Sequence, residues 1–170
     1  MEAKDDIMKT CLAIIGVIAI ATAAQAAPRD EAKIRALLAT WAKAYASKDA
    51  AAVMRMYALG RELVAYDLAA PLQYRGYEAY KKDYQDYFDA YAGPLVVEER
   101  DVHVATDGNL GYAFGLERVA GVLKVGGKTD GWSRFTTLFR RIHGHWYAIH
   151  DHISVPADLS TGKAALDLKP

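Results

Sequence analysis

The sequence has one cysteine, no net charge and none of the short motifs that mark the common enzyme classes. A single cysteine, Cys11, excludes an intramolecular disulfide, so stability must come from the apolar core or from oligomerisation. Equal numbers of basic and acidic residues, 21 of each, argue against nucleic acid as a partner. No G-x-S-x-G, Walker loop, dinucleotide fingerprint or H-E-x-x-H is present, which disfavours the common hydrolases, NTPases, Rossmann enzymes and zincins.

The first 26 residues are typical of a secretory signal peptide. Lys9 precedes an apolar run over residues 11–21, and Ala24-Gln25-Ala26 forms a small-residue cleavage site. The run is short for a membrane span, although an uncleaved anchor is the alternative interpretation. We expect cleavage after Ala26, a periplasmic or secreted mature protein, and no membrane association after cleavage. A start at Met8 is the alternative to one at Met1.

Three helices are expected in the first part of the remaining chain. The second covers Ala50–Ala58 behind a cap at Asp49, and the third covers Tyr77–Tyr91, whose aromatic stripe favours packing against a sheet. The first helix presents an apolar face at three- and four-residue spacing, made by Ile34, Leu37, Leu38, Trp41 and Tyr45.

Strands dominate the rest. A short strand is expected over Glu62–Asp67, and four longer ones follow, over Leu95–Ala105, over Leu110–Val125, and two within Gly131–Pro156 that are joined at residues 142–145. Helices followed by a meander of strands predict an α+β domain over residues 27–156, with three N-terminal helices packed on a strongly curved antiparallel sheet. Residues 157–170 are expected to form a tail.

Alternation along the last two strands selects a candidate pocket face. Trp132, Arg134 and Thr136 share one face of the first strand, and His150 and His152 share one face of the second. We expect these five side chains to line the concave side of the sheet. An arginine among aromatic residues suits a carboxylate ligand, because guanidinium binds carboxylates through two parallel hydrogen bonds. The alternative for Arg134 is an ion pair with Asp67 or Glu117.

Asp67 ends the first short strand, directly after Tyr66, and is a candidate general base because burial would raise its pKa. The alternative is a carboxylate that caps a turn. His150-Asp151-His152 has the spacing by which one strand offers two imidazoles to a metal, but Asp67 is the only evident third ligand. We therefore expect no metal site and no cofactor, with both histidines bonded to neighbouring strands or lining the pocket.

The chain resembles the SnoaL-like/NTF2-like superfamily, which includes ketosteroid isomerases, polyketide cyclases and the association domain of calcium/calmodulin-dependent kinase II. The resemblance covers residues 31–156, and its final segment is most similar to the kinase association domain. It rests on Trp41…Tyr45…Lys48-Asp49…Tyr57, on Tyr66-Asp67…Tyr74-Arg75-Gly76, and on Trp132-x-Arg134-x-Thr136…Arg140-Arg141…Gly144-x-Trp146…His150-x-His152-x-Ser154-x-Pro156.

The resemblance implies a cone-shaped domain with a ligand cavity that Trp41, Tyr45 and Tyr66 help to line. Asp67 matches the proton-shuttling Asp of the isomerases. The tyrosine of the isomerase oxyanion hole falls on Trp41, and the protonated Asp falls near Thr136. The base position is thus kept and the oxyanion pair is replaced, which disfavours ketosteroid isomerisation itself.

Three functions follow as expectations. The first is a secreted protein that binds a small organic ligand, either a carboxylate or a hydrophobic molecule, in the cone cavity. The second is a cofactor-free isomerase, cyclase or dehydratase with Asp67 as base and His150 or His152 as acid. The third is an oligomerisation module that forms a homodimer or a larger ring through the open face of the sheet. The fold alone does not decide between them.

Overall fold

The computed structural model describes residues 27–170, so the predicted signal peptide and both candidate start residues lie outside the described residues. A long helix covers residues 27–46. Helix α2 (Ala50–Val53) continues as the 3-10 turn η1 (Met54–Met56), and Oδ1 of Asp49 accepts the Ala52 amide at 2.9 Å, as the predicted cap requires. Within residues 27–170, no helix is both long and apolar enough to cross a membrane.

The main sheet has six strands in the order β2-β1-β6-β5-β4-β3. The α+β prediction is confirmed, and the sheet is mixed because β1 pairs parallel to β6 while its other pairs are antiparallel. The bounds are β1 (Val64–Tyr66), β2 (Tyr74–Arg75), β3 (Val96–Asp107), β4 (Leu110–Val122), β5 (Lys128–Ile142) and β6 (His145–Ser154).

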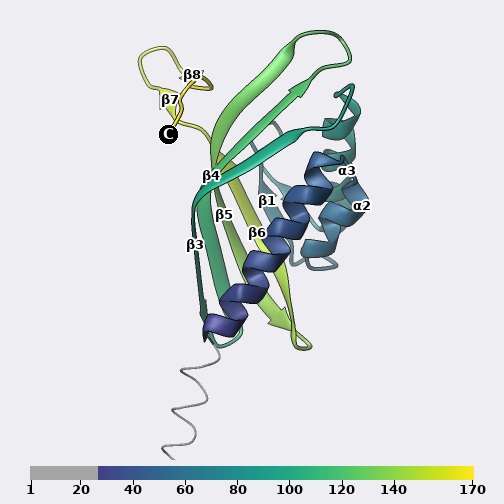
Figure 1. The fold of residues 1–170 in the computed structure, drawn as a ribbon, viewed down its shortest axis with the longest axis vertical. Coiled ribbons are helices and arrows are strands. Elements are labelled where there is room, and N and C mark those ends of the chain that lie inside the picture. The colour runs from purple at the N-terminus through teal and green to yellow at the C-terminus, as the bar shows by residue number, and fades with distance from the viewer. Residues whose placement is uncertain (1–26) are drawn as a thin grey trace, which may run out of the picture.

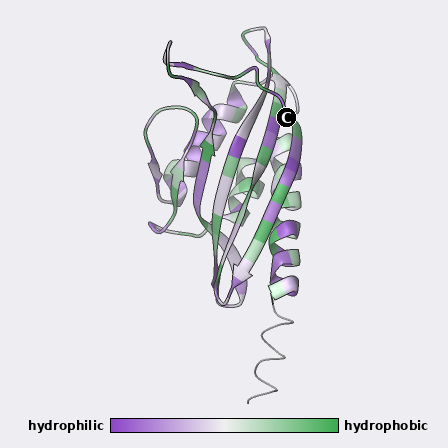
Figure 2. Cartoon of the chain, turned by 90° about the vertical axis from the view of Figure 1, so that its left-hand side faces the viewer, coloured by the Kyte–Doolittle hydropathy of each residue, from purple (hydrophilic) through white to green (hydrophobic). Residues whose placement is uncertain are grey.

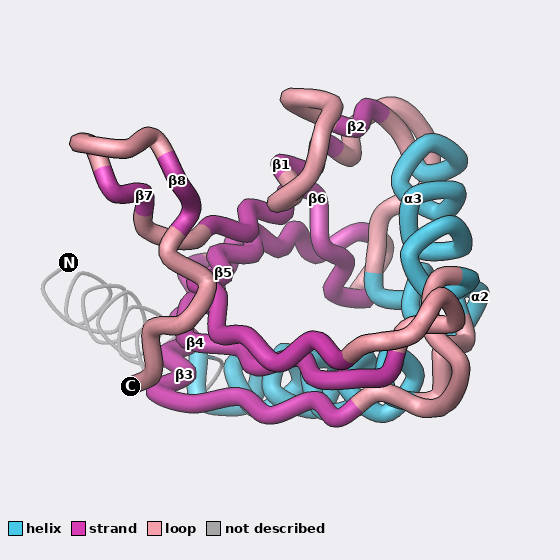
Figure 3. The backbone as a smooth tube through the Cα atoms, turned by 90° about the horizontal axis from the view of Figure 1, so that it is seen from above, coloured by secondary structure: helices cyan, strands magenta, loops and turns pink. Residues whose placement is uncertain are grey.

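The helices cover the concave side of this curved sheet. Figure 1 shows the long first helix and α3 (Tyr77–Asp89) lying against the strands, and Figure 3 shows the sheet bending around so that α2 and α3 close its open side. The aromatic stripe of α3 packs inward as expected, with Tyr80, Tyr84 and Phe88 all buried. Apolar and polar residues alternate along the long strands (Figure 2), as in a sheet with one face on the core.

A β-bulge in β6 determines which side chains face the core. Leu138 pairs with His150 and Phe139 pairs with Ala148, so Ile149 is the extra residue opposite β5. A bulge reverses the alternation of faces beyond it. Ala148 is buried before the bulge and Asp151 is buried after it. His150 is therefore turned to the outer face.

Residues 157–170 fold back on the domain. They contain the short hairpin β7 (Ala157–Asp158) and β8 (Lys163–Ala164), which Figure 1 shows beside one end of the sheet. The hairpin is separate from the six-stranded sheet. Leu166, just beyond β8, lies at the wall of the cavity described below. The segment predicted to be a tail thus contributes to the site.

Candidate functional site

A cavity of about 480 Å³ lies between the helices and the concave face of the sheet. Its wall is mainly aromatic: the long helix contributes Trp41 and Tyr45, and the α3 segment contributes tyrosines. Trp41 and Tyr45 pack together with ring centroids 4.9 Å apart, and the predictions that both line the cavity are confirmed. A volume of this size accommodates a small organic molecule.

Asp67 also borders the cavity, where the chain leaves β1. Burial raises the pKa of Asp67 to about 6, and the negative charges of Asp83 and Asp151 act in the same direction. The hydrogen bond from the Leu68 amide opposes this shift. The carboxyl is therefore largely ionised at neutral pH and retains more basicity than an ordinary aspartate.

Glu117 on β4 is the second carboxyl of the cavity wall, whereas the sequence indicated it only as an alternative ion-pair partner of Arg134. Only 6% of the residue is exposed, and no hydrogen bond or salt bridge from the described residues reaches its carboxyl. Burial raises its pKa to about 8, with further contributions from the charges of Asp151, Glu99 and Asp67. Strand alternation provided no signal for this position, because the larger apolar residues Tyr112 and Phe114 lie on the opposite face of β4, where each is 44% exposed.

Trp41 also carries a polar atom that lacks a partner. The residue is 6% exposed, and its indole N–H has no hydrogen-bond acceptor within residues 27–170. Trp41 also borders a much smaller adjoining pocket that Glu117, Glu99 and Asp151 line. An unsatisfied buried donor costs roughly 1–3 kcal/mol.

Beneath the cavity, Asp151 organises a buried hydrogen-bond network. Its Oδ2 accepts from the hydroxyls of Tyr57 at 2.8 Å and Tyr80 at 3.3 Å, and its Oδ1 accepts from Thr137 at 2.8 Å. Tyr57 and Tyr84 share a further hydrogen bond of 2.8 Å. Burial raises the pKa of Asp151, and the three donors oppose that shift. Because Tyr80 and Tyr84 also line the cavity, this network holds part of the cavity wall in place.

Arg134 and Thr136 do not line the cavity, and their predicted place there is wrong. Both side chains are exposed, while Ser133, Phe135 and Thr137 occupy the inner face of β5. The apolar Phe135 decides which face is buried, and strand alternation then sends its neighbours outward. The described residues contain no salt bridge from Arg134, so its alternative as a partner of Asp67 or Glu117 is also wrong.

His150, His152 and Tyr66 are likewise absent from the cavity wall. The β6 bulge turns the two histidines outward, and Tyr66 lies next to the buried Ala65 on β1 and so faces the other way. Nδ1 of His150 donates to the Val64 carbonyl at 2.8 Å, so this histidine is bonded to the neighbouring strand. Tyr66 packs edge-on against both imidazoles, with centroids 4.9 Å and 5.7 Å away. The expected combination of Asp67 as base with either histidine as acid in one cavity is therefore wrong.

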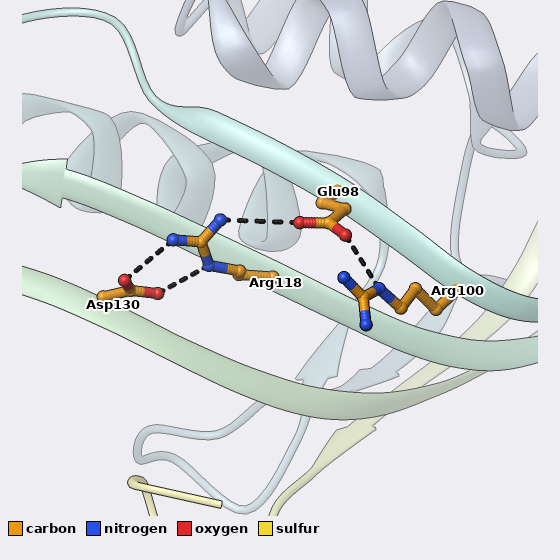
Figure 4. Close-up of polar contacts among 4 residues, drawn as sticks. All are labelled: Glu98, Arg100, Arg118 and Asp130. Carbon is orange, nitrogen blue, oxygen red and sulfur yellow. Dashed lines mark hydrogen bonds and ion pairs between the residues drawn. The ribbon is translucent and has the colours of Figure 1, made fainter. Parts of the chain in front are cut away.

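Trp132 borders the cavity as predicted, and the Arg100 guanidinium lies 4.9 Å from the centre of its ring. Arg100 belongs to an ion-pair network across β3, β4 and β5 (Figure 4). Arg118 binds Asp130 through two bonds of 2.7 Å and 2.8 Å, and Glu98 bridges Arg118 and Arg100. The charges of Arg118 and Asp130 are thus already paired with each other. No group of three or more His, Cys, Asp or Glu side chains between residues 27 and 170 is placed to hold a metal.

The sequence and the structure are similar to known proteins over most of the chain. The family model for the SnoaL-like domain matches residues 34–158. An NTF2-like protein of unknown function from Pseudomonas putida KT2440 is 33% identical, with a TM-score of 0.76 over 84% of this chain and 98% of that one. No curated protein matches the sequence.

Two more distant structures share the fold. A ketosteroid isomerase-like protein from Erwinia carotovora atroseptica SCRI1043 is 20% identical, with a TM-score of 0.63 over 74% of this chain and 95% of that one. The association domain of C. elegans CaMKII is 16% identical, with a TM-score of 0.60 over 75% and 97% of the two chains. At these identities the likeness concerns the fold alone.

Proposed function

The chain belongs to the SnoaL-like domain family, and we propose that it binds a small, largely apolar organic molecule in its cone cavity. The observation that carries this proposal is the aromatic cavity of about 480 Å³ with two carboxyls in its wall, Asp67 and Glu117, neither of which has a salt-bridge partner among the described residues. The rings contribute apolar contact area, and the carboxyls orient a ligand that presents a hydrogen-bond donor.

Between the two ligand types expected from the sequence, the hydrophobic one is favoured over the carboxylate. Arg134, on which the carboxylate expectation rested, is exposed on the outer face. Asp67, Asp83 and Glu117 line the cavity, and Lys128 stands among the lining residues as an exposed cation. An anionic ligand would meet this acidic wall at an electrostatic cost.

The test is to fill the cavity and compare the variant with a matched change on the outer face of the sheet. Val119 lines the cavity and Thr136 is exposed, so Val119→Trp and Thr136→Trp add the same ring on opposite sides. Binding of 2-naphthol, measured by calorimetry, should weaken at least tenfold in Val119→Trp and stay unchanged in Thr136→Trp. Thermal melts establish that both variants fold. Undiminished binding by a folded Val119→Trp would exclude the cavity as the site.

A second candidate function is cofactor-free proton transfer in the same cavity, as in an isomerase, cyclase or dehydratase. It is favoured by one specific observation: the pKa of Asp67 is raised to about 6 and that of Glu117 to about 8. At pH 7 Asp67 is thus ionised and can accept a proton from carbon, while Glu117 is protonated and can donate one to an oxygen that gains charge. Glu117 replaces the histidines as the proposed acid.

This candidate is tested with enolisable unsaturated ketones as substrates. Asp67→Asn should abolish turnover and leave the fold intact. Asp83→Asn is the matched control: Asp83 also lines the cavity, and its charge raises the pKa of Asp67, so turnover should persist with its pH profile shifted to lower pH. Turnover that persists in Asp67→Asn would refute the assignment.

Secretion to the periplasm or the exterior and self-association through the outer sheet face complete the proposal. Tyr112 and Phe114 on β4 are each 44% exposed, and His103 of β3 stacks on Phe114 with ring centroids 5.0 Å apart. Exposed apolar side chains that are clustered mark interaction surfaces. Light scattering at micromolar concentration should find a homodimer or a larger homo-oligomer, which Phe114→Glu dissociates. A monomeric wild-type protein would contradict this part of the proposal.

A further inference from the structure

We propose that the cavity selects protonated amines, with Glu117 as the carboxylate that binds the ammonium group. This inference rests on the proposed ligand binding and adds the chemical class of the ligand. Glu117 is 6% exposed, borders the cavity, and receives no hydrogen bond or cation from the described residues. A buried carboxyl in such a position is complemented by a ligand that brings donors and positive charge.

The groups around Glu117 make the site acidic from several directions. Asp151 approaches from β6, Glu99 from β3 and Asp67 from the end of β1, and each of their charges disfavours a further negative charge on Glu117. Asp83 of α3 lines the same cavity. Lys128 also borders it, from an exposed position at the start of β5. A bound cation would relieve the repulsion among these carboxyls.

The aromatic wall adds a second, independent reason. Trp41 and Tyr45 pack at 4.9 Å, and Tyr45 meets Tyr84 edge-on at 5.9 Å, so several rings surround one side of the cavity. Ring faces attract ammonium groups, and more strongly where water is excluded. A small aromatic amine combines the required charge with apolar bulk.

Proton linkage gives this inference a distinctive signature. Without ligand, Glu117 with a pKa of about 8 is mostly protonated at pH 7. An ammonium ion beside it favours the ionised form, so binding releases a proton. Affinity for an amine should therefore rise with pH, by about 50-fold between pH 6 and pH 8 if the bound-state pKa falls well below 6. A neutral ligand of the same shape should bind with little dependence on pH over this range.

The experiment compares tryptamine with its neutral alcohol analogue, tryptophol, by calorimetry on the purified protein. At pH 7.5 tryptamine should bind at least tenfold more tightly, and measurements in two buffers with different ionisation enthalpies should detect proton release. In Glu117→Gln tryptamine affinity should fall at least tenfold, and its preference over tryptophol should disappear. Glu99→Gln, a control at a neighbouring carboxyl that does not border the main cavity, should keep the preference for tryptamine.

The outcomes separate this inference from the proposed function. Equal affinity for both compounds, or a preference that survives in Glu117→Gln, would overturn amine selectivity while leaving ligand binding intact. Binding of neither compound would overturn both. If Glu117→Gln does not fold, proton release and the pH dependence of the wild-type protein still decide the question.

Discussion

Replacing Glu117 by glutamine should stabilise the protein at neutral and alkaline pH. An ordinary glutamate has a pKa of 4.5, whereas burial and neighbouring carboxylates raise that of Glu117 to about 8. The folded state therefore binds a proton that the unfolded chain releases. The stability linked to this group is fully present below pH 4.5, falls as pH rises, and is lost once pH exceeds 8.

The size of the effect follows from these two pKa values. One tenfold step in acidity corresponds to ~1.36 kcal/mol, so the wild-type protein loses ~3 kcal/mol between pH 4.5 and pH 7 through this group, and ~5 kcal/mol above pH 8. Glutamine carries no ionisable proton and escapes this loss. At pH 7 the substitution should thus raise the melting temperature by roughly 6–12 °C for a domain of this size.

Urea unfolding of both proteins at pH 5, 7 and 8.5 measures the difference directly. The advantage of Glu117→Gln should be small at pH 5 and grow with pH. Glu98→Gln is the control, because Glu98 lies on the same sheet but pairs with Arg100 and Arg118 at the surface. That change should cost at most ~1 kcal/mol. If Glu117→Gln had the same stability as the wild type at pH 8.5, or a constant advantage at all three pH values, the buried-carboxyl interpretation would be refuted.

Three further predictions concern the rest of the cavity and its support. Tyr57→Phe removes a buried hydroxyl that donates to Asp151 at 2.8 Å, and should lower the free energy of unfolding by about 1–3 kcal/mol in urea titrations; an unchanged value would mean that the network contributes nothing to stability. Truncation after Pro156 removes Leu166 from the cavity wall, so 2-naphthol affinity should fall while the melting temperature changes little, and unchanged affinity would exclude a role for the C-terminal segment. Gly115→Ala would place a methyl carbon 2.9 Å from the Arg100 carbonyl oxygen and 3.0 Å from the Phe135 ring. Because the backbone of β3 cannot easily move away, the free energy of unfolding should fall by roughly 1–3 kcal/mol. Stability equal to that of the wild type would show that β3 adjusts freely.

The sequence allowed the fold to be predicted because its local signals agree with one another. The first helix keeps an apolar face through Ile34, Leu38 and Trp41, all of which are buried. The turn at Gly108 and Asn109 separates β3 from β4 as the turn residues indicate. Helical period, capping residues and turn chemistry are all local properties, and each can be recognised in a short segment of the sequence.

The predicted site was only partly right, because the direction of a strand side chain depends on features that are not local. Trp41, Tyr45, Asp67 and Trp132 border the cavity, whereas Arg134 faces outward on the strand that also carries Trp132. The bulge at Ile149 follows from pairing with β5, and no residue type in the segment marks it. A shift of one residue was enough to move the histidines to the opposite face.

Three buried carboxyls at one cavity are the features that bear most directly on function. Asp67, Glu117 and Asp151 lie in or beneath one cavity, and burial raises the pKa of all three. Asp151 accepts three hydrogen bonds, which offset the cost of burying its carboxyl. The hydrogen-bond network that it organises explains why a carboxyl stands there. Glu117 has no such compensation, although leucine or methionine would fill its position without the electrostatic cost. A residue that lowers stability and faces an open cavity is best explained by what the cavity binds, so Glu117 is the residue at which ligand selectivity should be sought first.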